Sequence, residues 1–233
     1  MALFLIIAVF RQMTWSSLAA RSNDPAEFLK AHRKAMFSSH NPRGHTLGIV
    51  GLGKIGFAIA RKVRLACGME ILYHDREQRS TADEQEVSAT FYDSLDEMLG
   101  KSDCVLLATP GGPTILNART LALTKRGCRV VNIGRGSLID EDALADVMES
   151  EHISAAGLDV HTHEPNPNSR LSKRWDVMGT CHTGGGSVDT IRGFETLVME
   201  NVELVLTGQE PKTAVNKQFL RQDTNGLVNG NHH

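Results

Sequence analysis

Three side chains suited to acid–base chemistry follow apolar, strand-like runs in the second half of the chain. Arg135 stands in VVNIGRGSLIDEDAL, Glu164 in ISAAGLDVHTHEPNP, and His182 in VMGTCHTGGGS. A guanidinium can hold a substrate carboxylate and polarise a neighbouring carbonyl group. An imidazole can exchange a proton with a hydroxyl or carbonyl oxygen, and a carboxylate on its other nitrogen orients it and favours its protonated form. Together these residue types predict an acid–base site.

Each of these residues also has a purely structural interpretation. Arg135 could cap a loop, Glu164 could be a solvated residue before Pro165, and His182 could anchor a turn. Taken singly, the structural interpretation is favoured. The acid–base interpretation is favoured because a predicted nucleotide-binding loop occurs in the same chain.

That loop is the glycine-rich segment GLGKIG, which carries the spacing Gly51-x-Gly53-x-x-Gly56. It follows a predicted strand and opens a predicted helix, the context that a dinucleotide-binding loop requires. Gly51 would allow the tight turn, Gly53 the approach of a pyrophosphate, and Gly56 close helix–strand packing. Asp75, 19 residues beyond Gly56, would bind a ribose hydroxyl and favours NAD over NADP, a preference that the adjacent Arg76 weakens.

The elements that must position these side chains alternate between strand and helix. Predicted strands cover Thr46–Leu52, Glu70–His74, Cys104–Thr109, Arg129–Ile133, Ile153–Val160 and Val177–Cys181. Predicted helices cover Ile55–Ala66, Leu95–Lys101, Ala118–Thr124, Glu141–Glu149 and Val188–Leu206. Apolar strands alternating with amphipathic helices predict an α/β fold with a Rossmann-type, doubly wound parallel sheet. Open sheets of this kind place ligands at the carboxyl ends of their strands, where all three candidate residues lie.

The pattern divides the chain into four parts. Residues 1–44 are predicted to form an opening helix and a linker, and residues 45–187 the nucleotide-binding domain. Residues 188–215 hold the C-terminal helix, and the polar segment 216–233 is predicted to be a mobile tail.

The length, charge and composition of the chain are those of an ordinary globular protein. The chain has 233 residues and a net charge of −2, which gives no reason to expect a nucleic-acid partner. Its four cysteines lack CxxC spacing and are expected to be reduced, as in a cytoplasmic protein. His161 and His163 lie two residues apart without a third ligand nearby, so no metal site is predicted.

The opening stretch MALFLIIAVF is apolar from Ala2 to Phe10. A membrane-spanning helix needs about 20 apolar residues, and a secretory signal needs a basic segment before the apolar core. This run has neither, so a buried helix is predicted and membrane association is not. No capping residue precedes the run, which indicates that it is the interior of a longer helix.

The chain resembles the D-isomer-specific 2-hydroxyacid dehydrogenase family in four motifs that occur in the family's order: GLGKIG, NIGRGSLIDEDAL, GLDVHTHEP and TCHTGGG. The residues within these motifs are most similar to those of fungal members of the D-mandelate dehydrogenase type. The resemblance implies reversible hydride transfer between NAD and a 2-hydroxy or 2-oxo acid, with Arg135, Glu164 and His182 as the catalytic residues. It also implies a homodimer formed through the N-terminal helix. The implied NAD site consists of Gly51, Gly53, Lys54, Ile55, Gly56, Asp75, Thr109, Pro110, Ile133, Arg135, Asp159 and His182.

The sequence departs from the family pattern in three respects. The loop after Thr109-Pro110 (GGPTILNA) is shorter than usual, which affects the adenine-side wall of the implied NAD site. Cys181 stands where a proline usually precedes the histidine. The N-terminal lobe that binds the substrate carboxylate in the family has no counterpart, so a truncated form is expected. Two alternatives to an active enzyme therefore stay open: an NAD-binding fragment without catalysis, and an NAD-sensing protein similar to a corepressor.

Overall fold

The computed structural model describes residues 1–215, and the tail predicted for residues 216–233 lies outside them. The chain divides into two compact units, Met1–Gly184 and a second that begins at Gly185. The second unit contains the helix α10 (Val188–Leu206), whose predicted bounds are confirmed. All the candidate site residues belong to the first unit.

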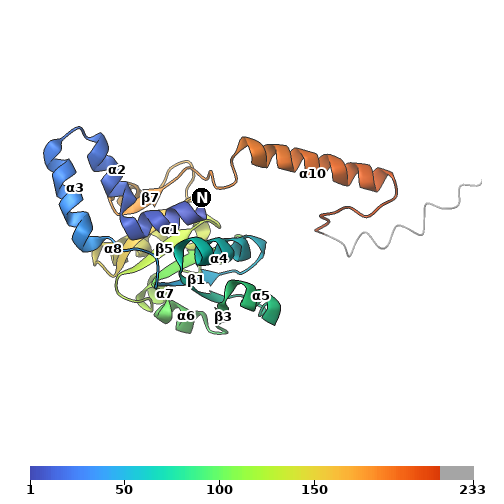
Figure 1. Cartoon of the computed structure of the whole chain (residues 1–233), viewed down its shortest axis with the longest axis horizontal. Helices are drawn as coiled ribbons and strands as arrows, with labels where there is room; N and C mark the ends of the chain where they lie inside the picture. The colour runs from blue at the N-terminus through green and yellow to red at the C-terminus, as the bar shows by residue number, and fades with distance from the viewer. Residues whose placement is uncertain (216–233) are drawn as a thin grey trace, which may run out of the picture. The chain divides into compact units, whose positions relative to one another are not determined.

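The first unit is built on a seven-stranded parallel sheet with the strand order β3-β2-β1-β4-β5-β6-β7 (Figure 1). The strands are β1 (Thr46–Val50), β2 (Glu70–His74), β3 (Ala89–Phe91), β4 (Cys104–Leu107), β5 (Cys128–Asn132), β6 (Ile153–Leu158) and β7 (Val177–Gly179). Strand order reverses at β1, which pairs with β2 on one side and β4 on the other. The predicted doubly wound sheet is confirmed, and this reversal is where such sheets bind their ligands.

Helices cover both faces of the sheet, which explains why its central strands are apolar on both sides. One face packs against α1 (Ala2–Arg11), α4 (Lys54–Cys67) and α5 (Thr81–Val87). The other packs against α6 (Leu95–Lys101), α7 (Ala118–Ala122), α8 (Glu141–Glu149) and α9 (Ser169–Ser172). Each layer buries its own apolar cluster, so the sheet is held rigidly from both sides.

The opening stretch forms α1, and the predicted buried helix is confirmed. Leu5, Ile6 and Phe10 are fully buried against the sheet. Gln12 has a left-handed backbone (φ 50°), and α1 and α2 (Met13–Arg21) are bent by 76° at this residue. Within residues 1–215 no single helix is long and apolar enough to cross a membrane, although these two bent helices satisfy the length and composition criteria when taken together.

The segment predicted as a short helix and linker contains a helix of 14 residues, α3 (Pro25–Ser38). Asp24 caps its first turn by accepting from Ala26 N, and proline at the first helical position is favourable there. Figure 1 shows α2 and α3 as a hairpin. Lys34 of α3 lies 5.0 Å from the ring centre of Trp15 and 4.9 Å from that of Trp175, so cation–π contacts hold this hairpin against the body of the unit.

Several predicted strands are too long at their carboxyl ends. The ladders end at Val50, Leu107, Leu158 and Gly179, each two residues before the predicted end. The apolar run continues past each ladder because buried residues such as Leu52 and Val160 line the turn that follows. The elements α5 and β3 were not predicted, since their short and largely polar sequences lack an apolar period.

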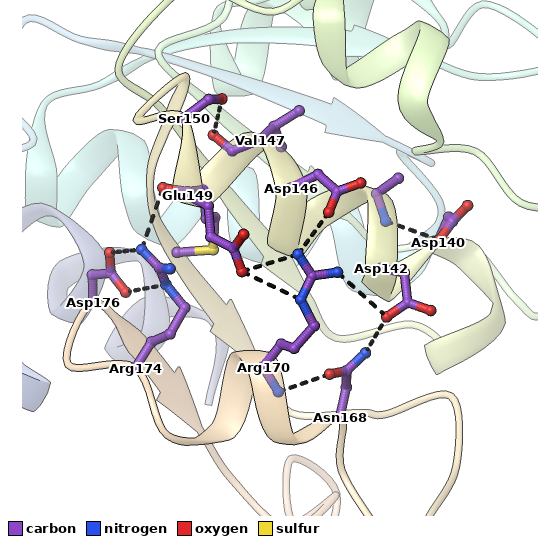
Figure 2. A network of polar contacts seen from close by, with 12 residues as sticks. Asp140, Asp142, Asp146, Val147, Glu149, Ser150, Asn168, Arg170, Arg174 and Asp176 are labelled. Atoms are coloured by element: carbon purple, nitrogen blue, oxygen red, sulfur yellow. Dashed lines mark hydrogen bonds and ion pairs between the residues drawn. The ribbon is translucent and has the colours of Figure 1, made fainter.

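An ion-pair network joins α8 to α9, the element that follows the Glu164 loop (Figure 2). Arg170 of α9 lies 2.6 Å from Asp146 and 2.9 Å from Glu149, and Asn168 donates to Asp142 at 2.9 Å. The segment after β6 is therefore fixed to α8 at its far end.

Candidate active site and cofactor-binding edge

The glycine-rich loop after β1 has the geometry that its sequence predicts. Gly51 has a φ of +93°, and a Cβ there would lie 2.6 Å from Thr109 Cγ2, so only glycine fits this turn. A Cβ at Gly56 would collide with the Gly51 carbonyl oxygen. Gly53 has open space around its Cα and begins α4 without a side-chain cap. The first N–H groups of α4 are thus available to an anion such as a phosphate.

Asp75 lies at the end of β2, beside this loop. Its Oδ2 accepts from Leu52 N at 2.8 Å and its Oδ1 from Arg76 N at 2.8 Å. A carboxylate has about four acceptor sites, so two bonds to the backbone leave capacity for the hydroxyl groups of a ribose. Asp75 is therefore oriented by the glycine loop itself.

The residues around the loop fit a dinucleotide. Thr109 Oγ1 is buried and has no hydrogen-bond partner in the described chain, and buried hydroxyls are nearly always bonded. Thr109 contacts the glycine turn, where a ligand could supply the missing partner. The other predicted cofactor residues lie at the same edge of the sheet, after β1, β4 and β5: Lys54, Ile55, Pro110 and Ile133.

Glu164 and His182 meet after β6 and β7. His182 Nδ1 lies 3.0 Å from Glu164 Oε2, and both side chains are more than a third exposed. The pKa of Glu164 is held below its usual value, chiefly by the hydrogen bond from His182 and then by that from His161 N. An ionised carboxylate only accepts, so Nδ1 carries the proton and Nε2 is the nitrogen left to face a substrate.

The conformation of His182 is set by Asp159. His182 has a φ of +54°, a left-handed conformation that costs energy for a residue with a side chain. Asp159 is buried, and its carboxylate accepts from Thr183 N at 3.0 Å and Gly184 N at 2.8 Å. Its carbonyl oxygen accepts from His182 N at 2.7 Å, and Thr180 Oγ1 donates to Oδ1 at 2.7 Å. These four bonds stabilise the strained turn.

Arg135 follows β5, the strand beside β6. Its Nη1 donates to Gly134 O at 2.7 Å, and within the described residues no hydrogen bond joins it to Glu164 or His182. The buried Asn132 shapes the turn by accepting from Gly134 N at 3.0 Å and donating to Arg135 O at 2.8 Å. The structure thus joins Glu164 to His182 and leaves the exposed guanidinium free to meet an external carboxylate.

Four residues that sequence analysis did not assign to the predicted site organise this edge. Asn132 and Thr180 hold the turns described above, and two further residues contact the Glu164 loop: Glu141, which accepts from Thr162 N at 2.9 Å, and His161, whose Nε2 lies 2.9 Å from Thr180 O. Glu141 begins α8 and follows the helix cap Asp140, so its sequence position resembles a helix start. What sets Glu141 apart from an ordinary helix-start glutamate is its burial. Burial depends on the tertiary structure, so the sequence could not reveal it.

Comparison with known proteins agrees with this geometry. Residues 3–184 match the D-isomer specific 2-hydroxyacid dehydrogenase, NAD binding domain. A glyoxylate reductase from Thermococcus gammatolerans is 34% identical over 220 residues, which are 93% of this chain and 65% of the relative. The holo form of Rhodotorula graminis D-mandelate dehydrogenase is 39% identical with a TM-score of 0.89, and the match covers 91% of this chain and 63% of that one. A glyoxylate reductase from Paecilomyes thermophila is 35% identical with a TM-score of 0.83, over 93% and 64% of the two chains.

The parallel sheet with its glycine loop at the β1 switch point defines a dinucleotide-binding domain of Rossmann type. The strand-end loops and the match over residues 3–184 then define the particular family. The chain belongs to the D-isomer specific 2-hydroxyacid dehydrogenases, through their NAD-binding domain. It spans about 65% of the length of the curated relatives it matches.

Proposed function

We propose that this protein is an NAD-dependent oxidoreductase that interconverts D-2-hydroxy acids and 2-oxo acids. The observation that carries the proposal is the Glu164–His182 contact of 3.0 Å at the same sheet edge as the glycine loop and Arg135. An oriented imidazole beside a dinucleotide site is what reduction of a carbonyl group requires. Family membership and relatives named glyoxylate reductase and D-mandelate dehydrogenase support the substrate class.

In this proposal each residue has a separate role. The exposed Arg135 guanidinium binds the substrate carboxylate and polarises the adjacent carbonyl group. His182 holds a proton on Nε2 and donates it to the carbonyl oxygen, while Glu164 accepts from Nδ1 and stabilises the charged imidazole. The nicotinamide, when bound, supplies the hydride. Asp159 keeps His182 in place through the bonds to the following backbone and is proposed to lie near the nicotinamide amide.

The first experiment separates cofactor binding from turnover. NADH and NADPH are titrated by fluorescence, and the loaded protein is then offered a panel of 2-oxo acids that includes glyoxylate and phenylglyoxylate. We expect tighter binding of NADH, because the Asp75 carboxylate repels a 2′-phosphate, followed by oxidation of NADH with at least one acid. Binding without oxidation of NADH by any acid would contradict the proposed activity.

A second candidate function is NAD binding without catalysis, as in a sensor or a cofactor-binding fragment. It is favoured by one observation, that the family match over residues 3–184 is to the NAD-binding domain. The same titration decides between the two, because this function predicts NADH binding with no turnover on any member of the panel.

We further propose a cytoplasmic homodimer formed through α1. Phe4 and Ile7 are 47% and 37% exposed on a helix whose other face is buried, and such an apolar face suits a second copy of the chain. The four free cysteines are compatible with a reducing compartment. Light scattering on Phe4→Glu should show a shift toward monomer, and fractionation tests the location.

A further inference from the structure

Glu141 has a buried carboxylate that the proposed reaction does not use. The residue is only 7% exposed, although a buried carboxylate costs free energy unless it is well bonded. It stands in the first turn of α8, where the helix dipole favours a negative charge. That helix is already capped, because Asp140 accepts from Ala143 N at 3.0 Å. Capping therefore does not explain why Glu141 is buried.

The side chain of Glu141 bonds to the loop between β6 and α9. Its Oε1 accepts from Thr162 N at 2.9 Å. A hydrogen bond from a backbone N–H to a carboxylate oxygen is stronger than one between two neutral groups. The same loop is pressed onto the turn that follows Arg135. A Cβ at Gly136 would collide with the backbone of His161 and Thr162, and Thr162 Oγ1 donates to Gly136 O at 3.3 Å.

The next bonds connect this loop to the Glu164–His182 pair. His161 N donates to Glu164 Oε1 at 3.0 Å, so the peptide beside Thr162 holds the carboxylate directly. The His161 ring contacts Thr180 O at 2.9 Å, two residues before His182. A cavity of about 500 Å³ borders Glu141, His161 and Glu164, so packing around this loop is incomplete. Hydrogen bonds must therefore carry much of the loop's position.

We propose that Glu141 is a positioning residue for the Glu164–His182 pair, acting through Thr162 and the His161 peptide. This assignment rests on the proposed function. Glu141 holds the loop from the α8 side, the loop holds Glu164 through His161 N, and Glu164 orients His182. Loss of the Glu141 carboxylate removes the acceptor of Thr162 N, so the loop is held less firmly and Glu164 moves away from the imidazole.

The test uses the full chain and three variants. Glu141→Leu removes the acceptor, and Glu141→Gln keeps an oxygen acceptor without the charge. Glu97→Leu is the matched control, because Glu97 is exposed in the first turn of α6, which packs on β1 and β2, and its substitution removes the same charge near a helix start. Amide hydrogen exchange at His161 and Thr162 reports the loop directly and does not depend on turnover.

We expect Glu141→Leu to accelerate hydrogen exchange of both amides by about tenfold or more. The Thr162 amide loses its charged acceptor, and the His161 amide loses the neighbouring bond that holds the loop. We expect its kcat to fall by about 10- to 100-fold, the effect of a misplacement near 1 Å, while the KM of the 2-oxo acid and NADH affinity change little. The pH–rate profile should also shift, which a purely stabilising residue would not cause. Glu141→Gln should recover most of the exchange protection and of kcat.

Unchanged exchange at His161 and Thr162 in Glu141→Leu would overturn the assignment, as would equal effects in Glu97→Leu. If the wild-type chain oxidises NADH with no acid, the proposed function fails, and the exchange measurements still decide whether Glu141 positions the loop.

Discussion

Two glycines of the nucleotide loop allow packing and ligand binding to be separated by the same substitution. At Gly56 an added Cβ would collide with the Gly51 carbonyl oxygen, a backbone atom that cannot swing aside. Such overpacking costs up to about 3 kcal/mol. Replacing glycine by alanine inside a helix stabilises the helix by about 1 kcal/mol, which offsets part of this cost. The net loss for Gly56→Ala is therefore about 2 kcal/mol, which lowers Tm by roughly 4–8 °C in a unit of this size.

At Gly53 the same substitution meets open space, because no heavy atom lies within 4 Å of the added Cβ. The φ of −67° is allowed for any residue, so Gly53→Ala should leave the unfolding free energy unchanged or raise it by about 0.4–1 kcal/mol. Its methyl group instead occupies the space where a pyrophosphate would approach the backbone. We expect NADH to bind at least tenfold more weakly, a loss of about 1.4 kcal/mol or more.

The assay measures the Tm of thermal unfolding, and the NADH affinity by fluorescence titration, for both variants and the wild type. Gly112→Ala serves as a control for the substitution itself, because its Cβ also meets open space and it lies outside the nucleotide loop. Wild-type NADH affinity in Gly53→Ala would refute the binding role of the loop. A wild-type Tm in Gly56→Ala would refute the packing argument.

Three further predictions concern the site and the core. His182→Gln should lower kcat by orders of magnitude and leave NADH binding intact, since the glycine loop and Asp75 provide most of the proposed cofactor contacts; near-normal turnover would remove the assignment of the proton to His182. The lowered pKa of Glu164 means that its bonds contribute stability at pH values above its ordinary value of 4.5 and that this contribution is lost as the pH falls through the lowered pKa. Urea unfolding of wild type and Glu164→Gln should therefore converge at acid pH, and parallel curves would contradict the linkage. Ile6→Ala should cost about 2–5 kcal/mol because Ile6 of α1 is fully buried against the sheet, whereas Leu65→Ala, at an exposed position of α4, should lower Tm far less; similar melting of the two would show that α1 is not part of the core.

The sequence alone was sufficient for the sheet and the nucleotide loop, because their signals are local. The spacing of Gly51, Gly53 and Gly56 reflects backbone constraints within one turn, and strands buried on both faces are recognisable as apolar runs. Helix α8 begins at its predicted residue because Asp140 supplies a local cap. Strand β3 escaped prediction because its three residues are held by pairing with β2, and helix α5 because its short polar sequence has no apolar period.

The contacts within the site were decided by tertiary structure. Sequence analysis selected Arg135, Glu164 and His182 as separate side chains after three strands, and the fold brings only the last two into contact. The burial of Glu141 and its bond to Thr162 join residues 21 positions apart, and no local pattern encodes that approach. The left-handed His182 likewise depends on Asp159, on a neighbouring strand. Residue types and spacing therefore determined which chemistry the protein carries, whereas long-range hydrogen bonds across β6 and β7 determined how its groups are oriented.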